Sequence, residues 1–224
     1  MSAVTEQKTE GARSKPEPGR GIAVKVFYPI IRFVLLVFMR FYHWPTFRGF
    51  DRLPEGACIL CGNHSGFADP LWVDMGLKTR VPPWTMAKNV LFEKNRFFAK
   101  FLMAFRAFPV NRDAVDIASV KKSLSVLRKD EKLLIFPEGT RVKHGKVVTP
   151  KNGAILLAQR ADVPVIPVFI TPDRKPFQPI KVIMGEPYRP ACSCRRPDSD
   201  ELDRLTAELM DKIRALGNQQ TSKR

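Results

Sequence analysis

A histidine and a nearby aspartate, His64 and Asp69, are the two side chains whose types and spacing first point to chemistry. They lie in the segment Asn-His-Ser-Gly-Phe-Ala-Asp-Pro at residues 63–70, directly after an apolar run. Their spacing does not align them on one face of a helix, but a tight loop centred on Gly66 would bring them together. A carboxylate that accepts a hydrogen bond from one imidazole nitrogen fixes the tautomer and leaves the other nitrogen as a base. The segment therefore predicts that His64 is a general base oriented by Asp69.

This segment has two other interpretations. In the first, Asp69 is only a helix N-cap before Pro70, and His64 is an ordinary loop residue. In the second, Ser65 is a nucleophile, but this is disfavoured because Ser65 lacks a Gly-x-Ser-x-Gly elbow and an evident second histidine to activate it.

A second segment, Phe-Pro-Glu-Gly-Thr-Arg at residues 136–141, also follows an apolar run. It gathers a carboxylate, a flexible glycine, a hydroxyl and a guanidinium from Glu138, Gly139, Thr140 and Arg141. Ligands of α/β proteins tend to bind where strands exit into loops, and arginine suits bidentate recognition of phosphate. The segment predicts a phosphate-binding site, although the bare pattern also fits a turn with a solvated arginine.

Short apolar runs alternate with helix-like patterns along most of the chain, and these elements would position both segments. The expected strands cover residues 57–61, 132–136, 163–170 and 180–184. The expected helices cover residues 70–77, 97–105, 117–128, 154–160 and 200–216. This alternation predicts an α/β fold with a mixed, mostly parallel sheet flanked by helices.

The apolar stretch at residues 22–42 predicts an amphipathic helix ahead of this domain. On a helical projection its basic residues and His43 fall within roughly an 80° arc, and the remaining circumference is apolar. We expect a helix that lies on the membrane surface, with membrane contacts from Lys25, Arg32, Arg40 and Trp44. The alternatives are a buried helix packed on the domain and a tilted transmembrane span, although the basic residues count against a span.

The chain is strongly basic, with 38 Lys and Arg against 22 Asp and Glu and a formal net charge of +16. Such an excess favours a polyanionic partner, which is a nucleic acid, an anionic lipid surface or a phosphorylated substrate.

The four cysteines form two close pairs, Cys58 with Cys61 and Cys192 with Cys194. Because a Cys-x-Cys half is atypical of zinc sites, we expect buried thiols and no metal.

Taken together, these segments resemble the motifs of the glycerolipid acyltransferase family, which includes the 1-acyl-glycerol-3-phosphate acyltransferases. The family's His-x4-Asp motif corresponds to His64 and Asp69, and its Phe-Pro-Glu-Gly-Thr-Arg motif is unaltered at residues 136–141. Its other two motifs resemble residues 108–112, which end in Arg112, and the Val-Pro-Val strand at residues 163–167. The four motifs occur in the family's order with roughly its spacing.

The resemblance implies a reaction and a set of site residues. His64 would deprotonate the sn-2 hydroxyl of 1-acyl-glycerol-3-phosphate, which attacks an acyl thioester directly and gives phosphatidic acid. The donor would be acyl-CoA or an acyl carrier protein, and the chemistry requires no cofactor or metal. The residues expected at the acceptor phosphate are Glu138, Gly139, Thr140, Arg141 and Arg112, with Asn63, Lys88 and Lys151 as weaker candidates.

The resemblance covers about residues 45 to 190 and sets the expected domain organisation. Residues 1–20 form a flexible tail, residues 21–44 the membrane-associating helical segment, residues 45–218 the acyltransferase domain and residues 219–224 a second flexible tail. The protein would act at the cytoplasmic face of the cell membrane as a peripheral or monotopic enzyme. Its partners would be lysophosphatidic acid, the acyl donor and an anionic membrane surface.

Two alternatives stay open. One keeps the chemistry and changes the acceptor to another lysophospholipid, glycerol-3-phosphate or an aminolipid. The other is a non-catalytic basic protein that binds membrane lipid or nucleic acid. Because the sequence contains no recognised nucleic-acid-binding module, we expect no nucleic acid partner.

Overall fold

The structure is a computed structural model that describes residues 22–93, 95–111, 116–142, 148–192 and 197–218, and only the backbone of residues 22–27. The tails expected at residues 1–20 and 219–224 lie outside the described residues, as do Arg112, Cys194 and the side chain of Lys25.

The described residues form a seven-stranded sheet with the strand order β1-β7-β6-β2-β5-β3-β4. The four strands expected from the sequence are β2 (Cys58–Gly62), β5 (Lys132–Ile135), β6 (Val165–Ile170) and β7 (Lys181–Met184). Three further strands were not expected, and these are β1 (Thr46–Arg48), β3 (Trp84–Lys88) and β4 (Ala107–Val110). Neighbouring strands run parallel except β6 and β7, which run antiparallel, so the predicted mixed, mostly parallel sheet is confirmed.

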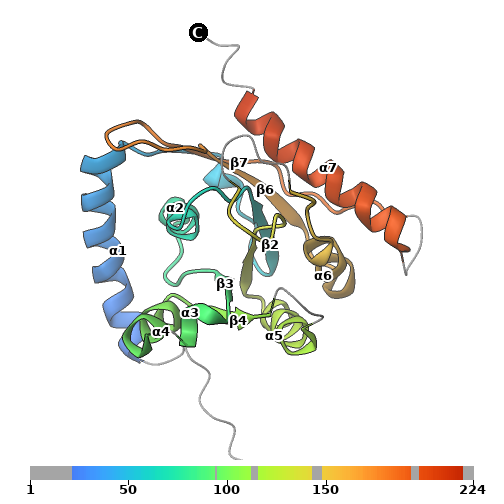
Figure 1. Cartoon of the computed structure of the whole chain (residues 1–224), viewed down its shortest axis with the longest axis horizontal. Helices are drawn as coiled ribbons and strands as arrows, with labels where there is room; N and C mark the ends of the chain where they lie inside the picture. The colour runs from blue at the N-terminus through green and yellow to red at the C-terminus, as the bar shows by residue number, and fades with distance from the viewer. Residues whose placement is uncertain (1–21, 94, 112–115, 143–147, 193–196, 219–224) are drawn as a thin grey trace, which may run out of the picture.

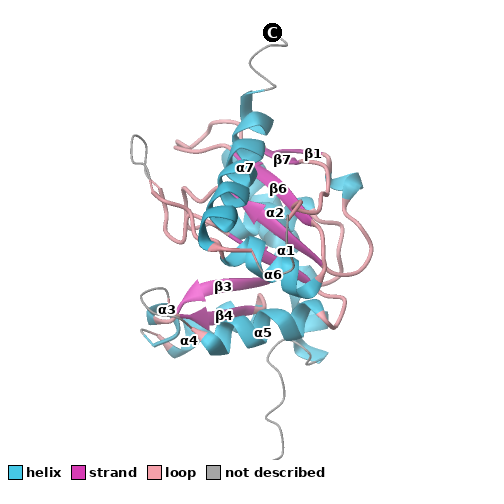
Figure 2. Cartoon of the chain, turned by 90° about the vertical axis from the view of Figure 1, so that its right-hand side faces the viewer, coloured by secondary structure: helices cyan, strands magenta, loops and turns pink. Residues whose placement is uncertain are grey.

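Helices cover both faces of the sheet (Figures 1 and 2). On one face lies α2 (Asp69–Gly76), with α1 (Ile22–His43) outside it, and on the other lie α5 (Ile117–Leu127), α6 (Gly153–Ala161) and α7 (Ser199–Asn218). Two short helices, α3 (Val90–Glu93) and α4 (Arg96–Ala104), pack on one another beside β3 and β4, and a 3₁₀ turn, η1 (Phe50–Arg52), follows β1. All five domain helices expected from the sequence are present.

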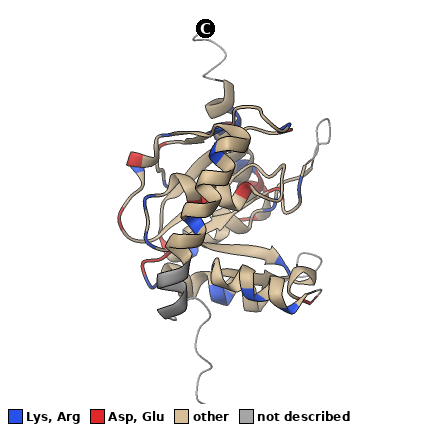
Figure 3. Ribbon diagram, turned by 90° about the vertical axis from the view of Figure 1, so that its left-hand side faces the viewer, with Lys and Arg blue, Asp and Glu red and all other residues tan. Residues whose placement is uncertain are grey.

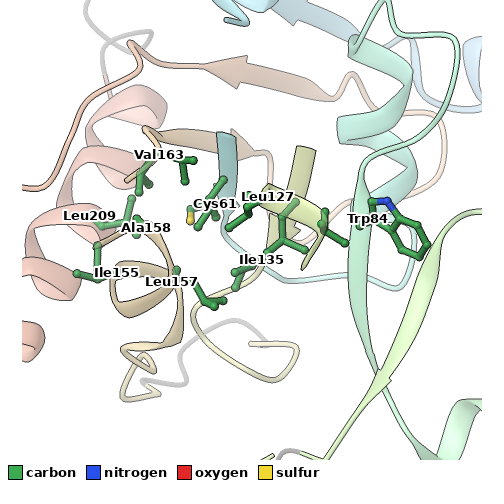
Figure 4. Close-up of a cluster of buried hydrophobic side chains, with 14 of the residues drawn as sticks. Cys61, Trp84, Leu127, Ile135, Ile155, Leu157, Ala158, Val163 and Leu209 are labelled. Carbon is green, nitrogen blue, oxygen red and sulfur yellow. The ribbon is translucent and has the colours of Figure 1, made fainter. Parts of the chain in front are cut away.

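The central strand β2 shows how the sequence builds two cores. Every residue of β2 is buried, and successive side chains point to opposite faces of the sheet. Ile59 and Cys61 therefore join the cluster beneath α5, α6 and α7 (Figure 4), whereas Cys58 and Leu60 join the cluster beneath α1 and α2. Both thiols are free, and burial raises the pKa of Cys58 to about 11.

Helix α1 is fastened to α2 by its inward face. Arg32 donates to the backbone oxygens of Asp74 and Met75 at 3.1 Å each and also to that of Leu77. These carbonyls belong to the last turn of α2 and the residue after it, where helix carbonyls lack intrahelical partners and the helix dipole favours a cation. This placement corrects the prediction for Arg32, because its guanidinium binds the protein instead of facing a membrane. His43, on the same arc, is also buried.

The outward face of α1 carries large apolar side chains that are exposed. Figure 3 shows that most of this helix is formed by uncharged residues. Arg40 is exposed on this helix, and Trp44, just after it, is 47% exposed. The exposed large apolar side chains of α1 are Ile30, Phe33, Val34, Val37, Phe38 and Phe41. Among the described residues, α1 included, no helix combines the length and apolarity needed to cross a membrane.

Candidate active site

The loop between β2 and α2 folds around the carboxylate of Asp69. His64 Nδ1 lies 2.8 Å from Asp69 Oδ2, and the same oxygen accepts hydrogen bonds from the backbone N–H groups of Ser65 and Gly66 at 2.7 Å each. Asp69 is the first residue of α2, and Ala68 occupies the N-cap position without a side-chain hydrogen bond. The simple N-cap interpretation of Asp69 is therefore wrong, because its carboxylate turns back into the loop and binds His64.

Asp69 is fully buried, yet it is held as an anion. Its other oxygen, Oδ1, accepts a hydrogen bond from Arg174, which lies after β6. Burial alone would raise the pKa of Asp69, but the hydrogen bond with His64, the charge of Arg174 and the N–H of Gly66 outweigh it. The pKa of Asp69 consequently lies below its usual value. A carboxylate in this state can orient the imidazole and would stabilise an imidazolium at His64.

The two segments singled out in the sequence are joined through the backbone of His64. Its N–H donates to Glu138 Oε2 at 2.7 Å, and its carbonyl accepts from the N–H of Val142 at 2.7 Å. Burial is the main cause that raises the pKa of Glu138, with the charge of Asp69 acting in the same direction. Glu138 thus fixes the position of His64, which is a different role from the predicted contact with phosphate.

The imidazole of His64 is packed on one side and borders a cavity on the other. Its ring stacks on Phe136 with a centroid distance of 4.3 Å and an interplanar angle of 22°. Because Nδ1 is engaged with Asp69, Nε2 is the nitrogen that can accept a proton. His64, Phe136 and Lys88 lie at or just after the carboxyl ends of β2, β5 and β3, so the parallel strands bring them to the same edge of the sheet.

A cavity of about 420 Å³ opens beside His64. Most of its lining is apolar and comes from β3, α3, α4 and the first half of α2. Thr140, Arg141 and Lys88 also line it, and Asp74 of α2 lines it too. Its size and mixed lining are typical of small-molecule sites, which combine apolar walls with a few polar groups.

The structure gathers only part of the predicted set of site residues. His64, Thr140, Arg141 and Lys88 line one cavity, and Asp69 lies directly behind His64. Asn63, Glu138, Gly139 and Lys151 are not among the residues that line it. Arg112 lies outside the described residues.

Three of the residues outside the cavity shape the two loops. The side chain of Asn63 donates to the carbonyl of Ile170 and accepts from its N–H, both at 2.8 Å, and so ties the end of β2 to the end of β6. Gly139 has a φ of 65°, a conformation that favours glycine, and a Cβ there would lie 3.3 Å from Lys151 Cε. Lys151 also donates its backbone N–H to the carbonyl of Pro137.

Arg174 is a charged residue of this site that was not predicted. It lies 105 residues from Asp69 along the chain, in a polar turn, and a lone arginine in such a turn has no distinguishing pattern. Only the fold places it against Asp69.

The chain is similar to known proteins of one family. A family model described as Acyltransferase matches residues 45–171. The 1-acyl-sn-glycerol-3-phosphate acyltransferase of Bacillus subtilis is 31% identical over 175 residues, which cover 75% of this chain and 85% of that protein. The protein of the same name from Streptococcus pneumoniae is 31% identical over 151 residues, which cover 66% of this chain but only 55% of that protein.

A solved structure shows the same fold. The crystal structure of the 1-acyl-sn-glycerophosphate acyltransferase from Thermotoga maritima superposes with a TM-score of 0.58 at 19% identity, covering 87% of this chain and 91% of that one. The family-model match and the Bacillus subtilis relative show that the chain belongs to the acyltransferase family, and the resemblance drawn from its motifs is confirmed. It is an enzyme of the O-acyltransferase class.

Proposed function

We propose that this protein transfers a fatty acyl group from an acyl thioester to the sn-2 hydroxyl of 1-acyl-glycerol-3-phosphate and so forms phosphatidic acid. The observation that carries the proposal is the His64–Asp69 pair, buried on the Asp69 side and open on the His64 side to a largely apolar cavity. The names of the relatives from Bacillus subtilis and Streptococcus pneumoniae support this choice of acceptor.

The chemistry needs one base and no covalent enzyme intermediate. Nε2 of His64 removes the proton of the acceptor hydroxyl while the oxygen attacks the thioester carbonyl. The tetrahedral adduct collapses, the carbon–sulfur bond breaks, and the imidazolium returns its proton to the departing thiolate. Asp69 stays ionised throughout and compensates the charge of the imidazolium. General base catalysis contributes about 10²–10⁴ in rate, so the remainder comes from positioning and electrostatics.

The cavity beside His64 would hold the acyl chain of a substrate. Its walls include Leu71, Leu91, Phe101, Leu102 and Phe105, which offer apolar surface to a fatty chain. A chain inside this cavity would bring its ester or thioester end toward His64, at the carboxyl edge of the sheet.

The acceptor phosphate would bind at Arg141, Thr140 and Lys88, which line the same cavity as His64. Arg141 supplies a bidentate donor, Thr140 a hydroxyl donor and Lys88 a mobile point charge. Arg112 stays a prediction for this site, because it lies outside the described residues.

We also propose that the enzyme works at the cytoplasmic face of the membrane and rests on it through α1. The exposed apolar face of α1 continues into Trp44, and the nearby Phe177, whose ring lies 5.3 Å from that of Tyr42, is 66% exposed. Such a surface suits the acyl–headgroup boundary, and the net charge of +16 suits anionic lipids. A membrane-bound enzyme would receive its lipid acceptor from the bilayer without releasing it into water.

The proposal is tested by acyl transfer from a labelled acyl-CoA to 1-acyl-glycerol-3-phosphate in liposomes, with His64→Ala alongside. The expected result is labelled phosphatidic acid from the wild type and a loss of about 10²–10⁴ in rate for the variant. Glycerol-3-phosphate, other lysophospholipids and an acyl carrier protein donor form the comparison panel. Absence of acyl transfer by the wild type with every donor and acceptor would contradict the proposal, as would full activity of His64→Ala.

A further inference from the structure

The least exposed ion pair of the site does not face the cavity. The side chain of Arg174 is 9% exposed, and its Nη2 donates to Asp69 Oδ1 and lies 3.4 Å from Ser65 Oγ. Its other terminal nitrogen, Nη1, is buried without a hydrogen-bond partner among the described residues. Arg174 is not among the residues that line the cavity beside His64, and it binds the oxygen of Asp69 that His64 does not use.

The catalytic loop leaves room for this guanidinium. Gly66 lies against it so closely that a Cβ on Gly66 would sit 2.1 Å from Nη2 of Arg174. The absence of a side chain at Gly66 therefore lets the loop close over Asp69 and Arg174 together. The N–H of Gly66 also donates to Asp69, so the loop, the carboxylate and the guanidinium form one unit.

The charges around Asp69 explain what Arg174 does. The groups that face Asp69 are His64, Arg174 and, at longer range, Glu138. Without Arg174, the buried carboxylate would face a neutral imidazole and a second carboxylate before each reaction cycle. Both burial and like charge favour protonation of a carboxylate, and a protonated Asp69 no longer stabilises the imidazolium.

We propose that Arg174 is a positioning residue for catalysis, which keeps Asp69 ionised and aimed at His64. This inference rests on the proposed function of the His64–Asp69 pair. It separates Arg174 from Arg141 and Lys88, which face the cavity, since Arg174 acts on the rate and pH dependence of transfer instead of on the binding of the acceptor.

The test compares Arg174→Gln and Arg174→Lys with the wild type over a range of pH. Arg174→Gln should lower kcat by about tenfold or more, leave KM for the acceptor nearly unchanged, and move the acid limb of the pH profile to higher pH. Arg174→Lys should recover part of both effects, because it restores a charge without the planar fork. Arg189→Gln is the matched control, because Arg189 forms an exposed ion pair with Asp162, and it should behave as wild type.

A second variant guards against a folding defect in Arg174→Gln. Gly66→Ala keeps Arg174 but pushes its guanidinium away from Asp69, and it should move the acid limb in the same direction. Thermal unfolding at each assay pH identifies the variants that are folded. Folded Arg174→Gln or Gly66→Ala with a wild-type kcat and pH profile would overturn the inference, and so would a change confined to KM.

A readout independent of activity separates this inference from the proposed function. Titration of ¹³C-labelled aspartate carboxyls by NMR should show the pKa of Asp69 higher in Arg174→Gln than in the wild type. An unchanged Asp69 titration would overturn the role of Arg174 even if the enzyme is active. Absence of acyl transfer in the wild type, together with a raised Asp69 pKa in Arg174→Gln, would instead contradict the proposed function and leave the role of Arg174 intact.

Discussion

Helix α2 carries a buried carboxylate near each end, and the pKa values of the two are shifted in opposite directions. Asp69 begins the helix and is fully buried, and its pKa lies below the usual value. Asp74 lies in the last turn and is 4% exposed, and burial raises its pKa to about 6. The difference is that Asp69 accepts hydrogen bonds from His64, Arg174 and two backbone N–H groups.

The side chain of Asp74 has fewer partners. Its Oδ1 accepts one hydrogen bond from Tyr28 at 2.5 Å, and its Oδ2 lies 3.9 Å from Nε of Arg32. Asp74 also lies at the carboxyl end of the helix, where the helix dipole disfavours an anion. The two carboxylates are therefore similarly buried but differ in charge state. Asp69, next to His64, is held as an anion, whereas Asp74, next to α1, gains a proton easily.

The largest effect is expected at Asp69. Asp69→Asn keeps the shape of the side chain but removes the charge that compensates the imidazolium, so acyl transfer should fall by about 10²–10⁴. Steady-state transfer by the folded variant measures this. Near wild-type transfer by Asp69→Asn would remove the functional contrast between the two carboxylates.

Replacing Asp74, in contrast to replacing Asp69, is expected to improve the protein, because it should raise the stability of the fold. Between its ordinary pKa of 3.8 and its folded pKa of about 6, the folded protein binds a proton that the unfolded chain has released. Asp74 thus lowers stability as pH rises through this window, on the order of 2–3 kcal/mol when the change is complete. Asp74→Asn should raise the melting temperature at pH 7, and the gain should disappear near pH 4.

Chemical denaturation of Asp74→Asn and of the wild type at several pH values checks this prediction. The wild type should lose stability relative to the variant between about pH 4 and pH 6. A pH-independent difference between the two proteins would show that the burial of Asp74 does not shift its titration.

A smaller effect is expected where α1 joins the Asp74 end of α2. Arg32→Leu removes the donor to three carbonyls and should destabilise the protein by about 1–3 kcal/mol, with faster hydrogen exchange in α1. Arg40→Leu is the matched control, because Arg40 is exposed on the same helix. Equal exchange in the two variants would mean that Arg32 does not fasten α1.

The smallest effect is expected at Ser65. Its backbone N–H donates to Asp69, whereas its Oγ has only a long contact with Arg174, so Ser65→Ala should change transfer by less than about tenfold. Transfer kinetics measure this. Loss of activity as large as that of Asp69→Asn would instead indicate that Ser65 is a nucleophile.

The sequence predicts the apolar strands in the middle of the sheet and misses the two edge strands, β1 and β4, together with β3 beside β4. The strands β2, β5, β6 and β7 are runs of apolar residues, whereas β1 has only three residues, β3 mixes polar and apolar residues, and β4 contains Pro109. Proline is tolerated there because β4 is an edge strand, at the end of the strand order. Short or mixed strands form because a neighbour pairs with them, and that neighbour is not visible in a local pattern.

The same limit applies to the site. Pairing of His64 with Asp69 could be predicted, because both residues lie in one short loop. The partners that come from distant segments could not, since Glu138 binds a backbone N–H and Arg174 reaches Asp69 from a turn after β6. The role of Arg32 was predicted wrongly for the same reason, because its amphipathic position on α1 does not reveal the carbonyls of α2.

Chemical rescue of His64→Ala by added imidazole tests the central claim, that Nε2 of His64 is the base, most directly. The variant leaves a gap beside Phe136 and next to the cavity, where a free imidazole can enter. Without imidazole we predict a rate about 10²–10⁴ below that of the wild type, and with imidazole a rate that rises with the concentration of its neutral form. Transfer by His64→Ala at the wild-type rate, with no response to imidazole, would contradict the account.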